Sequence, residues 1–475
     1  MTGPIKLEIS SKSISPPHVS GGRIIRDLLE AETDGLAIKI VCETGREVAL
    51  NLLEQAGVRG RAGGGFPTGH KWWLVASQET DQRYFVCNAN GVQPGSYKEG
   101  FLLRANPYKI VEAVTIATHC VGAKQGFLCL PQGFAEETTL LENAIRRAYE
   151  SGLLGTNALG SGRELHLKLV KTPDSYLAGE ESALLEFIEG KPLLPRGKPP
   201  LPTSCGLFGK PTAVNNLETV LQCRYALKAG AQAYREIGNR NAPGTMLFSL
   251  SGEVNRPGLY ELPLGIPLRQ LIFSHGEGIS PHTNFKAAFP GGIASALLDQ
   301  ELLDTPLDFD SLKDVGSDLG SGVVIVFGQE ACMVDLALQV ARFFSDTSCG
   351  KCLPCKDGTK RTQTMLTRLD HLNESSVDLV GVQMPASKRH PQLTVLNNTP
   401  RGISYTDTVK GLDKITHLCE FFKHRGDCHH SNEAATTLIS LVSKFKGEFE
   451  YHMQFGSCDV TIKTPSVQKR YAETV

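Results

Sequence analysis

The glycine-rich stretch Gly57-Val-Arg-Gly-Arg-Ala-Gly-Gly-Gly-Phe-Pro-Thr-Gly-His-Lys-Trp-Trp73 is the most informative part of the sequence. Six of its seventeen residues are glycine, so bare backbone amides can approach a phosphate or a flat ring that a Cβ would keep away. It is not a phosphate loop of the Gly-Lys-Ser/Thr type, because two tryptophans follow Lys71. A lysine beside aromatic rings suits phosphate contact and stacking. The stretch therefore predicts a mononucleotide or dinucleotide site, and the alternative is a glycine-rich turn without a ligand.

The composition limits the classes of protein to which the chain can belong. With 475 residues, two or three domains are expected. A net charge of -1 gives no reason to propose nucleic acid or an anionic membrane as a partner. The most apolar stretch, residues 111–129, is interrupted by charged and polar residues, and the start of the chain shows no signal-peptide pattern. We therefore expect a soluble cytoplasmic protein whose 13 cysteines are reduced thiols and metal ligands.

Short apolar runs alternate with helical patterns in the first half of the chain. Strands are predicted at residues 84–88, 126–130 and 166–170, with helices at 107–119 and 136–150. This alternation is typical of a parallel α/β layer, in which ligands bind at the carboxyl ends of the strands. The glycine-rich stretch and the polar turn at residues 88–95 are expected there.

The predicted secondary structure changes at two points in the second half of the chain. Residues 247–262 predict two strands joined by a Pro-Gly turn, residues 268–272 a short helix, and residues 323–327 a further strand. Together they indicate a small α+β module. From Met333 onward the apolar spacing is helical. At the other end of the chain, residues 1–20 are rich in serine and proline and are expected to form a loose arm.

Three cysteines form the motif Cys349-x-x-Cys352-x-x-Cys355. Three thiolates in one loop can bind three corners of an iron-sulfur cube, and a distant ligand then binds the fourth iron. Zinc usually takes two C-x-x-C pairs, and no second pair is present. The candidates for the fourth ligand are Cys419, Cys428 and Cys458, and the neighbouring His429 and His430 are either further candidates or polar surface residues.

Six motifs in the same order give the chain a family resemblance. They are residues 57–72, 88–98, 176–184, 206–212, 215–219 and 348–355. Together they resemble the NADH-binding flavoprotein subunit of respiratory complex I, and the diaphorase subunits of NAD-dependent formate dehydrogenases and hydrogenases. The resemblance covers roughly residues 45–455. It implies FMN, NAD(H) and one 4Fe-4S cluster as cofactors.

The same resemblance implies a domain organisation and a fold class. The expected parts are an N-terminal arm with helices (1–44), a Rossmann-like α/β domain for FMN and NADH (45–240), a ubiquitin-like α+β SLBB domain (245–330), a helical iron-sulfur domain (333–455) and a C-terminal tail (456–475). No thioredoxin-like 2Fe-2S domain precedes the FMN domain. A 2Fe-2S thioredoxin-like subunit and a larger iron-sulfur subunit are therefore the expected partners, and they could hold the chain peripherally on a membrane.

Site residues follow from the resemblance, position by position. FMN is assigned to Arg61, Ala62, Gly63, Gly65, Lys71, Asn88, Asn90, Asn215 and Asn216. The stacking of NADH is assigned to Phe66, Trp73 and Phe208, and the nicotinamide and ribose pocket to Tyr176, Gly179, Glu180 and Glu181. Glu180 and Gln93 take the catalytic positions. Cys428 becomes the fourth cluster ligand through its spacing from the ending Lys444–Phe449.

The chain departs from the family in the turn after the first strand, where Asn90, Gly91 and Gln93 stand at three acidic positions. Fewer negative charges near a flavin favour its reduced form, so a higher flavin potential is expected. The leading hypothesis is an electron-input subunit in which NADH reduces FMN and a 4Fe-4S cluster receives the electrons singly. Its alternative is a structural or electron-relay subunit that has lost FMN and NADH chemistry.

Overall fold

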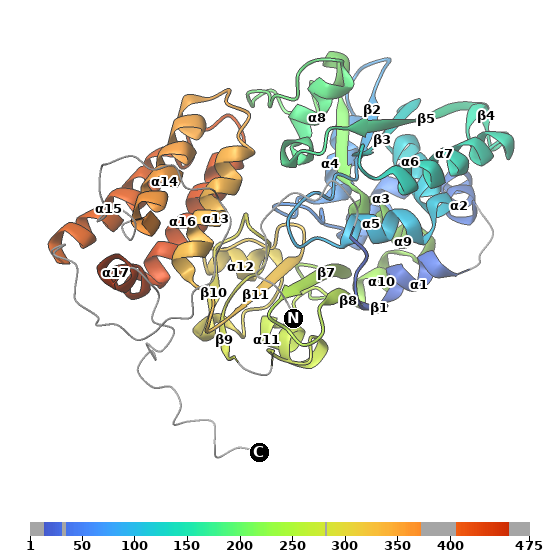
Figure 1. The fold of residues 1–475 in the computed structure, drawn as a ribbon. Helices are drawn as coiled ribbons and strands as arrows, with labels where there is room; N and C mark the ends of the chain where they lie inside the picture. Colours follow the sequence, from blue (N-terminus) through green and yellow to red (C-terminus); the bar gives the residue numbers. More distant parts are fainter. Residues whose placement is uncertain (1–13, 31–34, 281–282, 372–404, 456–475) are drawn as a thin grey trace.

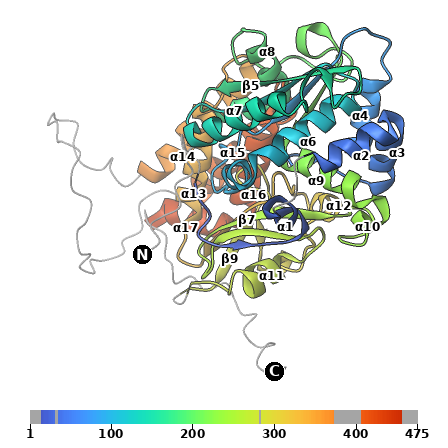
Figure 2. The ribbon, with the colours of Figure 1, turned by 90° about the vertical axis from the view of Figure 1, so that its right-hand side faces the viewer.

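The computed structural model describes residues 14–30, 35–280, 283–371 and 405–455 (Figure 1). An α/β part formed by the N-terminal half lies on one side of the molecule, and a second sheet lies below it. The C-terminal helices lie on the opposite side of that sheet (Figures 1 and 2).

The first sheet has five strands in the order β4-β5-β3-β2-β6. The strands β2 (Tyr84–Asn88), β3 (Gln125–Pro131), β5 (Arg163–Thr172) and β6 (Thr212–Asn216) are parallel, and β4 (Gly155–Ala158) is an antiparallel edge strand. The chain passes from β2 through β3 to β5 and then returns to β6 on the other side of β2. Such a reversal of strand order opens a crevice at the carboxyl ends of the strands.

Helices cover both faces of this sheet. One face, including Phe85 and Cys87, packs in a core with helices of the N-terminal half: α2 (Leu36–Thr44), α3 (Arg46–Ala56), α4 (Thr68–Ala76), α5 (Lys98–Ala105), α6 (Pro107–Cys120), α7 (Ala135–Glu150), α9 (Leu217–Ala229) and α10 (Ala231–Arg235). The opposite face, including Tyr84 and Val86, packs against α8 (Glu181–Ile188). Because both faces are buried, β2 and β3 are continuous apolar runs rather than alternating ones.

The second sheet has six strands in the order β1-β8-β7-β11-β9-β10, and its edge strand β1 is Val19–Ser20. The strands β7 (Thr245–Gly252) and β8 (Gly258–Pro263) form the predicted hairpin, and β11 (Val323–Gly328) pairs in parallel with β7. The strands β9 (Phe285–Phe289) and β10 (Leu298–Asp299) complete the sheet, and short helices α11 (Leu268–Gln270) and α12 (Phe309–Asp314) pack beside it.

The expectation that residues 1–20 form a loose arm is wrong for the last two of them. Val19 and Ser20 form β1, which pairs in parallel with β8 of the second sheet. The helix α1 (Arg23–Leu29) follows, and the buried carboxylate of Glu261 in β8 accepts the backbone N–H groups of Gly22, Ile24 and Ile25 at 3.1, 2.8 and 2.8 Å. A distant carboxylate therefore satisfies the free amides at the start of this helix.

The described residues of the C-terminal part form the helices α13 (Met333–Asp346), α14 (Leu353–His371), α15 (Tyr405–Phe422), α16 (His430–Lys444) and α17 (Lys446–Phe455). Their apolar faces share one core with the second sheet, where Phe344 and Leu438 pack with Phe289 and Ile325. The helices are thereby attached to the sheet, and the turn before α16 faces the first α/β part (Figure 1).

Candidate nucleotide and cluster site

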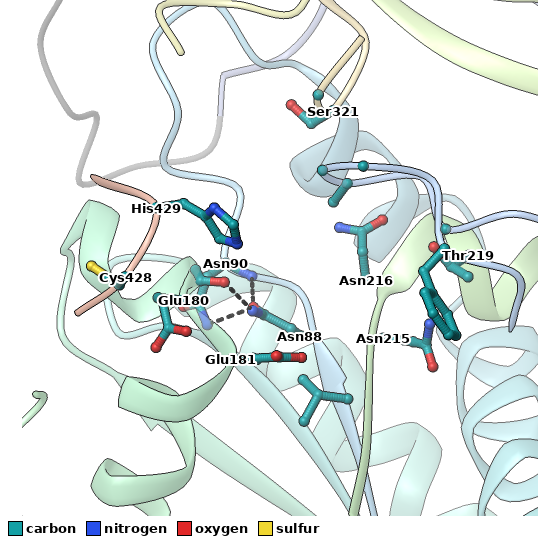
Figure 3. Close-up of a pocket in the computed structure, with 18 of the residues that line it drawn as sticks. Asn88, Asn90, Glu180, Glu181, Asn215, Asn216, Thr219, Ser321, Cys428 and His429 are labelled. Carbon is teal, nitrogen blue, oxygen red and sulfur yellow. Dashed lines mark hydrogen bonds between the residues drawn. The ribbon is translucent and has the colours of Figure 1, made fainter. Parts of the chain in front are cut away.

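A cavity of about 660 Å³ lies at the carboxyl ends of β2 and β6. Its walls come from all three parts of the fold: the glycine-rich stretch, the turn after β2, the chain entering α8, the start of α9, loops of the second sheet and the segment from Cys428 to Glu433. In Figure 3, Cys428 and His429 lie on the side of Glu180, whereas Asn215 and Asn216 lie on the opposite side. Residues that are far apart in the sequence therefore face one cavity.

The glycine-rich stretch presents bare backbone to this cavity. A Cβ on Gly63 or Gly64 would meet nothing within 4 Å, so the space beside these residues is open for a ligand. Gly63 and Gly65 have φ of 95° and 66°, a conformation that favours glycine. Lys71, on the first turn of α4, also lines the cavity. Open glycine backbone with a lysine beside it fits a phosphate-bearing ligand such as FMN.

Asn88 and Asn90 in the turn after β2 are held together by hydrogen bonds. The Oδ1 atom of Asn88 accepts from the backbone N–H and the side-chain amide of Asn90 at 3.0 and 2.9 Å (Figure 3). Their own amides also donate to the carbonyls of Gly179 and Ala178. The turn is thus tied to the segment that enters α8.

The side chain of Gln93, in the same turn, connects to loops of the second sheet. Its Nε2 donates to the carbonyl of Gly291 at 3.2 Å, and its Oε1 accepts from the Ser321 hydroxyl at 2.5 Å. Both the donor and the acceptor of the amide are used. A neutral amide suits this position, because a carboxylate would face the Gly291 carbonyl without a donor between them.

At the end of β6, Asn215 and Asn216 have different surroundings. The Oδ1 of Asn215 accepts from the indole of the fully buried Trp72 at 2.8 Å. The side chain of Asn216 caps α9 by accepting from the N–H of Glu218 at 2.9 Å. The register places Asn216 beside Asn88, so polar side chains converge at the ends of neighbouring strands.

Two glutamates and two lysines form an ion-pair network on the α8 side. Lys198 lies 3.0 Å from Glu180 Oε1 and 2.8 Å from Glu181 Oε1, and Lys71 lies 3.9 Å from Glu181 Oε2. Burial acts to raise the pKa of Glu181, but the charges of Lys71 and Lys198 outweigh it and hold this pKa below its ordinary value. Burial lowers the pKa of Lys71. Glu180 also caps α8, accepting from the N–H of Ala183 at 2.7 Å.

Tyr176 connects the first α/β part to the C-terminal helices. Its hydroxyl donates to Glu433 Oε2 on α16 at 3.2 Å, and its ring packs edge-on against Phe343. Burial, with the negative charges of Asp318 and Glu180, raises the pKa of Glu433 to about 7. A carboxyl group that titrates near neutral pH therefore lies in the wall of the cavity.

The motif cysteines lie where α14 begins. Burial raises the pKa of the Cys355 thiol to about 11 and that of the Cys428 thiol to about 12, and the charges of Cys349 and Cys355 contribute to the shift at Cys428. Lys351 in the motif forms an ion pair with Asp427, with Nζ and Oδ2 3.2 Å apart, so Cys428 lies on a segment that contacts the motif. Cys419 is fully buried in the helical core instead, with its sulfur 3.9 Å from the Thr362 hydroxyl.

Four thiols, with Cys352 as the fourth, match the donors that an iron-sulfur cluster requires. Within the described residues, no three His, Cys, Asp or Glu side chains are already arranged as metal ligands.

The described residues also contain no helix that is both long and apolar enough to cross a bilayer.

Most of the site residues predicted from the sequence line this cavity. They are Ala62, Gly63, Gly65, Phe66, Lys71, Asn88, Asn90, Gln93, Tyr176, Gly179, Glu180, Glu181, Asn215, Asn216 and Cys428. Trp73 and Phe208 do not line it and are exposed: Trp73 stacks on His70 with ring centroids 5.9 Å apart, and Phe208 contacts Tyr84. Arg61 does not line it either: the residue is fully buried, and its guanidinium donates to three backbone carbonyls and to the Tyr234 hydroxyl.

Sequence reasoning missed several residues of the cavity wall. They are Glu99, Lys198, Ser321 and Glu433. Lys198 lies in a proline-rich connector and Ser321 in a loop of another part of the fold, so no local pattern marks either. Glu99 follows the recognised 88–98 turn by one residue and was the easiest of them to find.

Comparison with known families gives three matches along the chain. Residues 53–224 match the Nuo51 FMN-binding domain, residues 247–283 match the SLBB domain, and residues 335–387 match the NADH-ubiquinone oxidoreductase-F iron-sulfur binding region. These regions follow one another in the predicted order. The predicted fold class is therefore confirmed.

Individual relatives agree with these matches. The NADH-quinone oxidoreductase F 2 subunit of Rhizobium meliloti is 37% identical over 335 residues, covering 70% of this chain and 80% of the relative. The corresponding F subunit of Streptomyces coelicolor is 33% identical, and the match covers 86% of this chain and 84% of the relative. A solved structure of an NAD⁺-reducing [NiFe]-hydrogenase in the H₂-reduced state superposes with a TM-score of 0.78 at 26% identity, covering 92% of this chain and 68% of that chain.

The cavity has open glycine backbone for a phosphate-bearing ligand, and the cysteines beside it supply the donors for an iron-sulfur cluster. The family matches name the same two cofactors for the same two regions. The chain therefore belongs to the family of NADH-quinone oxidoreductase F subunits and is the FMN- and 4Fe-4S-binding, NADH-oxidising flavoprotein component of a multisubunit oxidoreductase.

Proposed function

We propose that FMN and NADH bind in the cavity at the ends of β2 and β6, and that electrons leave through a cluster held by Cys349, Cys352, Cys355 and Cys428. FMN, when bound, accepts two electrons together as hydride and releases them singly, as an iron-sulfur cluster requires. The observation that carries this proposal is that Cys428 lines the same cavity as the glycine-rich stretch. A cluster ligand and the flavin site would then share one wall, with no intervening layer of protein.

The glycine-rich stretch and Lys71 are the proposed binding groups for the FMN phosphate. Gly63 and Gly64 offer backbone next to open space, and Lys71 supplies a nearby positive charge. Asn88 and Asn90 would orient the ribityl chain, and Asn216 would lie below the flavin ring. Each of these amides is already fixed by another hydrogen bond, so the site is organised before a ligand binds.

The ion-pair network and the exposed aromatic rings are the proposed NADH site. Phe66 lines the cavity and is 49% exposed, and Trp73 and Phe208 are 50% and 55% exposed. Such rings can stack on the flat groups of a dinucleotide. Glu180 and Glu181 would contact the ribose hydroxyls.

We further propose two partner subunits of the same complex, one thioredoxin-like with a 2Fe-2S cluster and the other a larger iron-sulfur subunit. Leu353 lies inside the cysteine motif and is 71% exposed, and Cys352 beside it is only partly buried. An exposed apolar residue next to a cluster supports docking of an electron acceptor at this surface. The proposed location is the cytoplasm, with any membrane attachment made through these partners.

The experiment is to purify the complex that contains this chain and to measure flavin and iron per chain. The expected result is about one FMN and four irons on this subunit after the partners are separated. Iron without flavin would instead support the alternative of a relay subunit that has lost FMN chemistry. Flavin without iron would refute the cluster assignment and leave the nucleotide site in place.

A further inference from the structure

A neighbouring side chain, and not its own backbone conformation, explains why the residue at position 91 in the turn after β2 is glycine. It is not among the glycines with positive φ, so its conformation is open to other residues. A Cβ on Gly91, however, would lie 2.5 Å from Cβ, 2.8 Å from Cγ and 2.6 Å from Oε2 of Glu99. The Cβ of Glu99 is fixed by helix α5 and cannot move aside. The space next to Gly91 is therefore filled by the side chain of Glu99.

The carboxylate of Glu99 lies in the cavity wall although the residue is only 4% exposed. Its Oε1 accepts from Asn216 Nδ2 at 3.0 Å, and its Oε2 accepts from the Ser96 hydroxyl at 3.1 Å. The other amide atom of Asn216, Oδ1, is used to cap α9. Glu99 therefore fixes both the position and the orientation of the Asn216 amide.

The charge of Glu99 is only partly compensated. The nearest ammonium, that of Lys98, is 3.9 Å from Glu99 Oε1 but 3.0 Å from Glu218 Oε2. Lys98 also donates to the carbonyls of Arg61 and Ser321. One cation thus stands between two carboxylates, and the glutamate nearer to the cavity has the weaker pairing.

We propose that Glu99 supplies the negative charge at the flavin end of the cavity and positions Asn216 there, and that Gly91 is small in order to admit it. The proposal rests on the proposed binding of FMN in this cavity. A carboxylate near a flavin disfavours the negative charge that reduction adds, so Glu99 lowers the flavin midpoint potential. The turn at Asn90 and Gln93 carries no charge, but Glu99 gives this end of the cavity a negative charge.

The primary test is a redox titration of the holo-complex that carries Glu99→Gln. This change keeps the shape of the side chain and an acceptor for Asn216 but removes the charge. The expected result is an upward shift of the FMN midpoint potential with FMN content unchanged. The control is Glu136→Gln, an exposed glutamate in the first turn of α7, which should leave the potential unchanged.

A second pair of variants tests the packing even if Glu99→Gln folds poorly. Gly91→Ala should lower the melting temperature of the FMN-free chain strongly in the wild-type background and much less in the Glu99→Gly background, because only the latter removes the clashing Cβ. In the double variant Gly91→Glu/Glu99→Gly, the carboxylate is attached at position 91 instead of position 99 and occupies the same space. The FMN midpoint potential of this variant should return close to that of the wild type.

The outcomes separate this inference from the proposed function. A wild-type complex without FMN would overturn both. A wild-type complex that holds FMN at a potential unaffected by Glu99→Gln would overturn the inference alone. Equal melting-temperature losses for Gly91→Ala in the two backgrounds would show that Glu99 does not fill the space beside Gly91.

Discussion

Replacing Arg61 with lysine distinguishes a ligand-binding arginine from a structural one. The Arg61 guanidinium is fully buried and donates to the carbonyls of Thr245, Arg59 and Pro243 at 2.9, 2.8 and 3.1 Å, and to the Tyr234 hydroxyl at 3.0 Å. These bonds tie the glycine-rich stretch to the start of the second sheet. Arg61 is therefore expected to support the stretch from behind rather than to contact FMN.

The size of the effect follows from these four bonds. The single ammonium of lysine cannot reach acceptors spread around a guanidinium, so we assume that one bond survives and three are lost. A hydrogen bond to a charged group contributes about 1.5 kcal/mol, which gives a loss of about 4.5 kcal/mol for Arg61→Lys. For a domain of roughly 200 residues, with a shift of about 2–4 °C per kcal/mol, the melting temperature should fall by about 9–18 °C.

The assay is thermal unfolding of the FMN-free chain, followed by FMN titration at a temperature where the variant is folded. Lys71→Met is the matched control. The Lys71 ammonium donates one hydrogen bond, to the Val214 carbonyl at 3.2 Å, and lies 3.9 Å from Glu181 Oε2, while Glu181 has a closer ion pair with Lys198 at 2.8 Å. The variant should therefore lose only about 1–2 kcal/mol of stability but most of its affinity for FMN. If Arg61→Lys melts like the wild type but binds FMN poorly, the guanidinium is a ligand and the reasoning is wrong.

Further predictions concern the cluster, the pH dependence of stability and the choice of nucleotide. Cys428→Ser should abolish or shift the low-temperature EPR signal of the reduced cluster, whereas Cys419→Ser should not; the reverse pattern would make Cys419 the ligand. The pKa of Glu433 is raised from 4.5 to about 7 in the folded chain, so folding takes up a proton between these pH values and this contribution to stability is lost as pH rises to about 7. The melting temperature of Glu433→Gln should therefore decrease less between pH 5 and pH 8 than that of the wild type. Equal decreases in the two proteins would contradict a raised pKa at Glu433. Gln93→Glu should lower the FMN midpoint potential and also destabilise the chain, and a redox titration without a downward shift would show that this side chain does not act on the flavin. Because Glu181 is ionised and accepts a ribose 2′-hydroxyl better than a 2′-phosphate, kcat/KM should be higher for NADH than for NADPH; equal values would refute this.

Local sequence patterns predicted much of the fold. The apolar run Tyr84–Asn88 is strand β2 with the same bounds, and the predicted helix 107–119 is α6 (Pro107–Cys120). Strand β6 (Thr212–Asn216) was not predicted, because it is short and ends in two asparagines. The end of the glycine-rich stretch is helical from Thr68 onward, which the glycines did not indicate, and Gly69 allows α4 to approach α3 closely.

The candidate site, like the fold, was predicted only in part from the sequence. The family resemblance of the motifs assigned Lys71, Asn88 and Glu181 to one site, and all three line the cavity. Spacing could not show that the Arg61 side chain turns away from this cavity, because the direction of a side chain depends on the acceptors that the rest of the fold places around it. Thr245 and Pro243, which accept from Arg61, belong to the chain that enters the second sheet.

The family, the order of the three parts and the residue types of the cofactor sites can be identified from the sequence, because they depend on local periodicity and on motifs that are short in sequence. Which charged groups meet depends on the tertiary structure. Glu99 beside Gly91, Lys198 between two glutamates and Glu433 against Tyr176 are contacts between segments 8 to 257 residues apart. The electrostatics of the cavity depend on distances through space, and these exist only once the chain has folded.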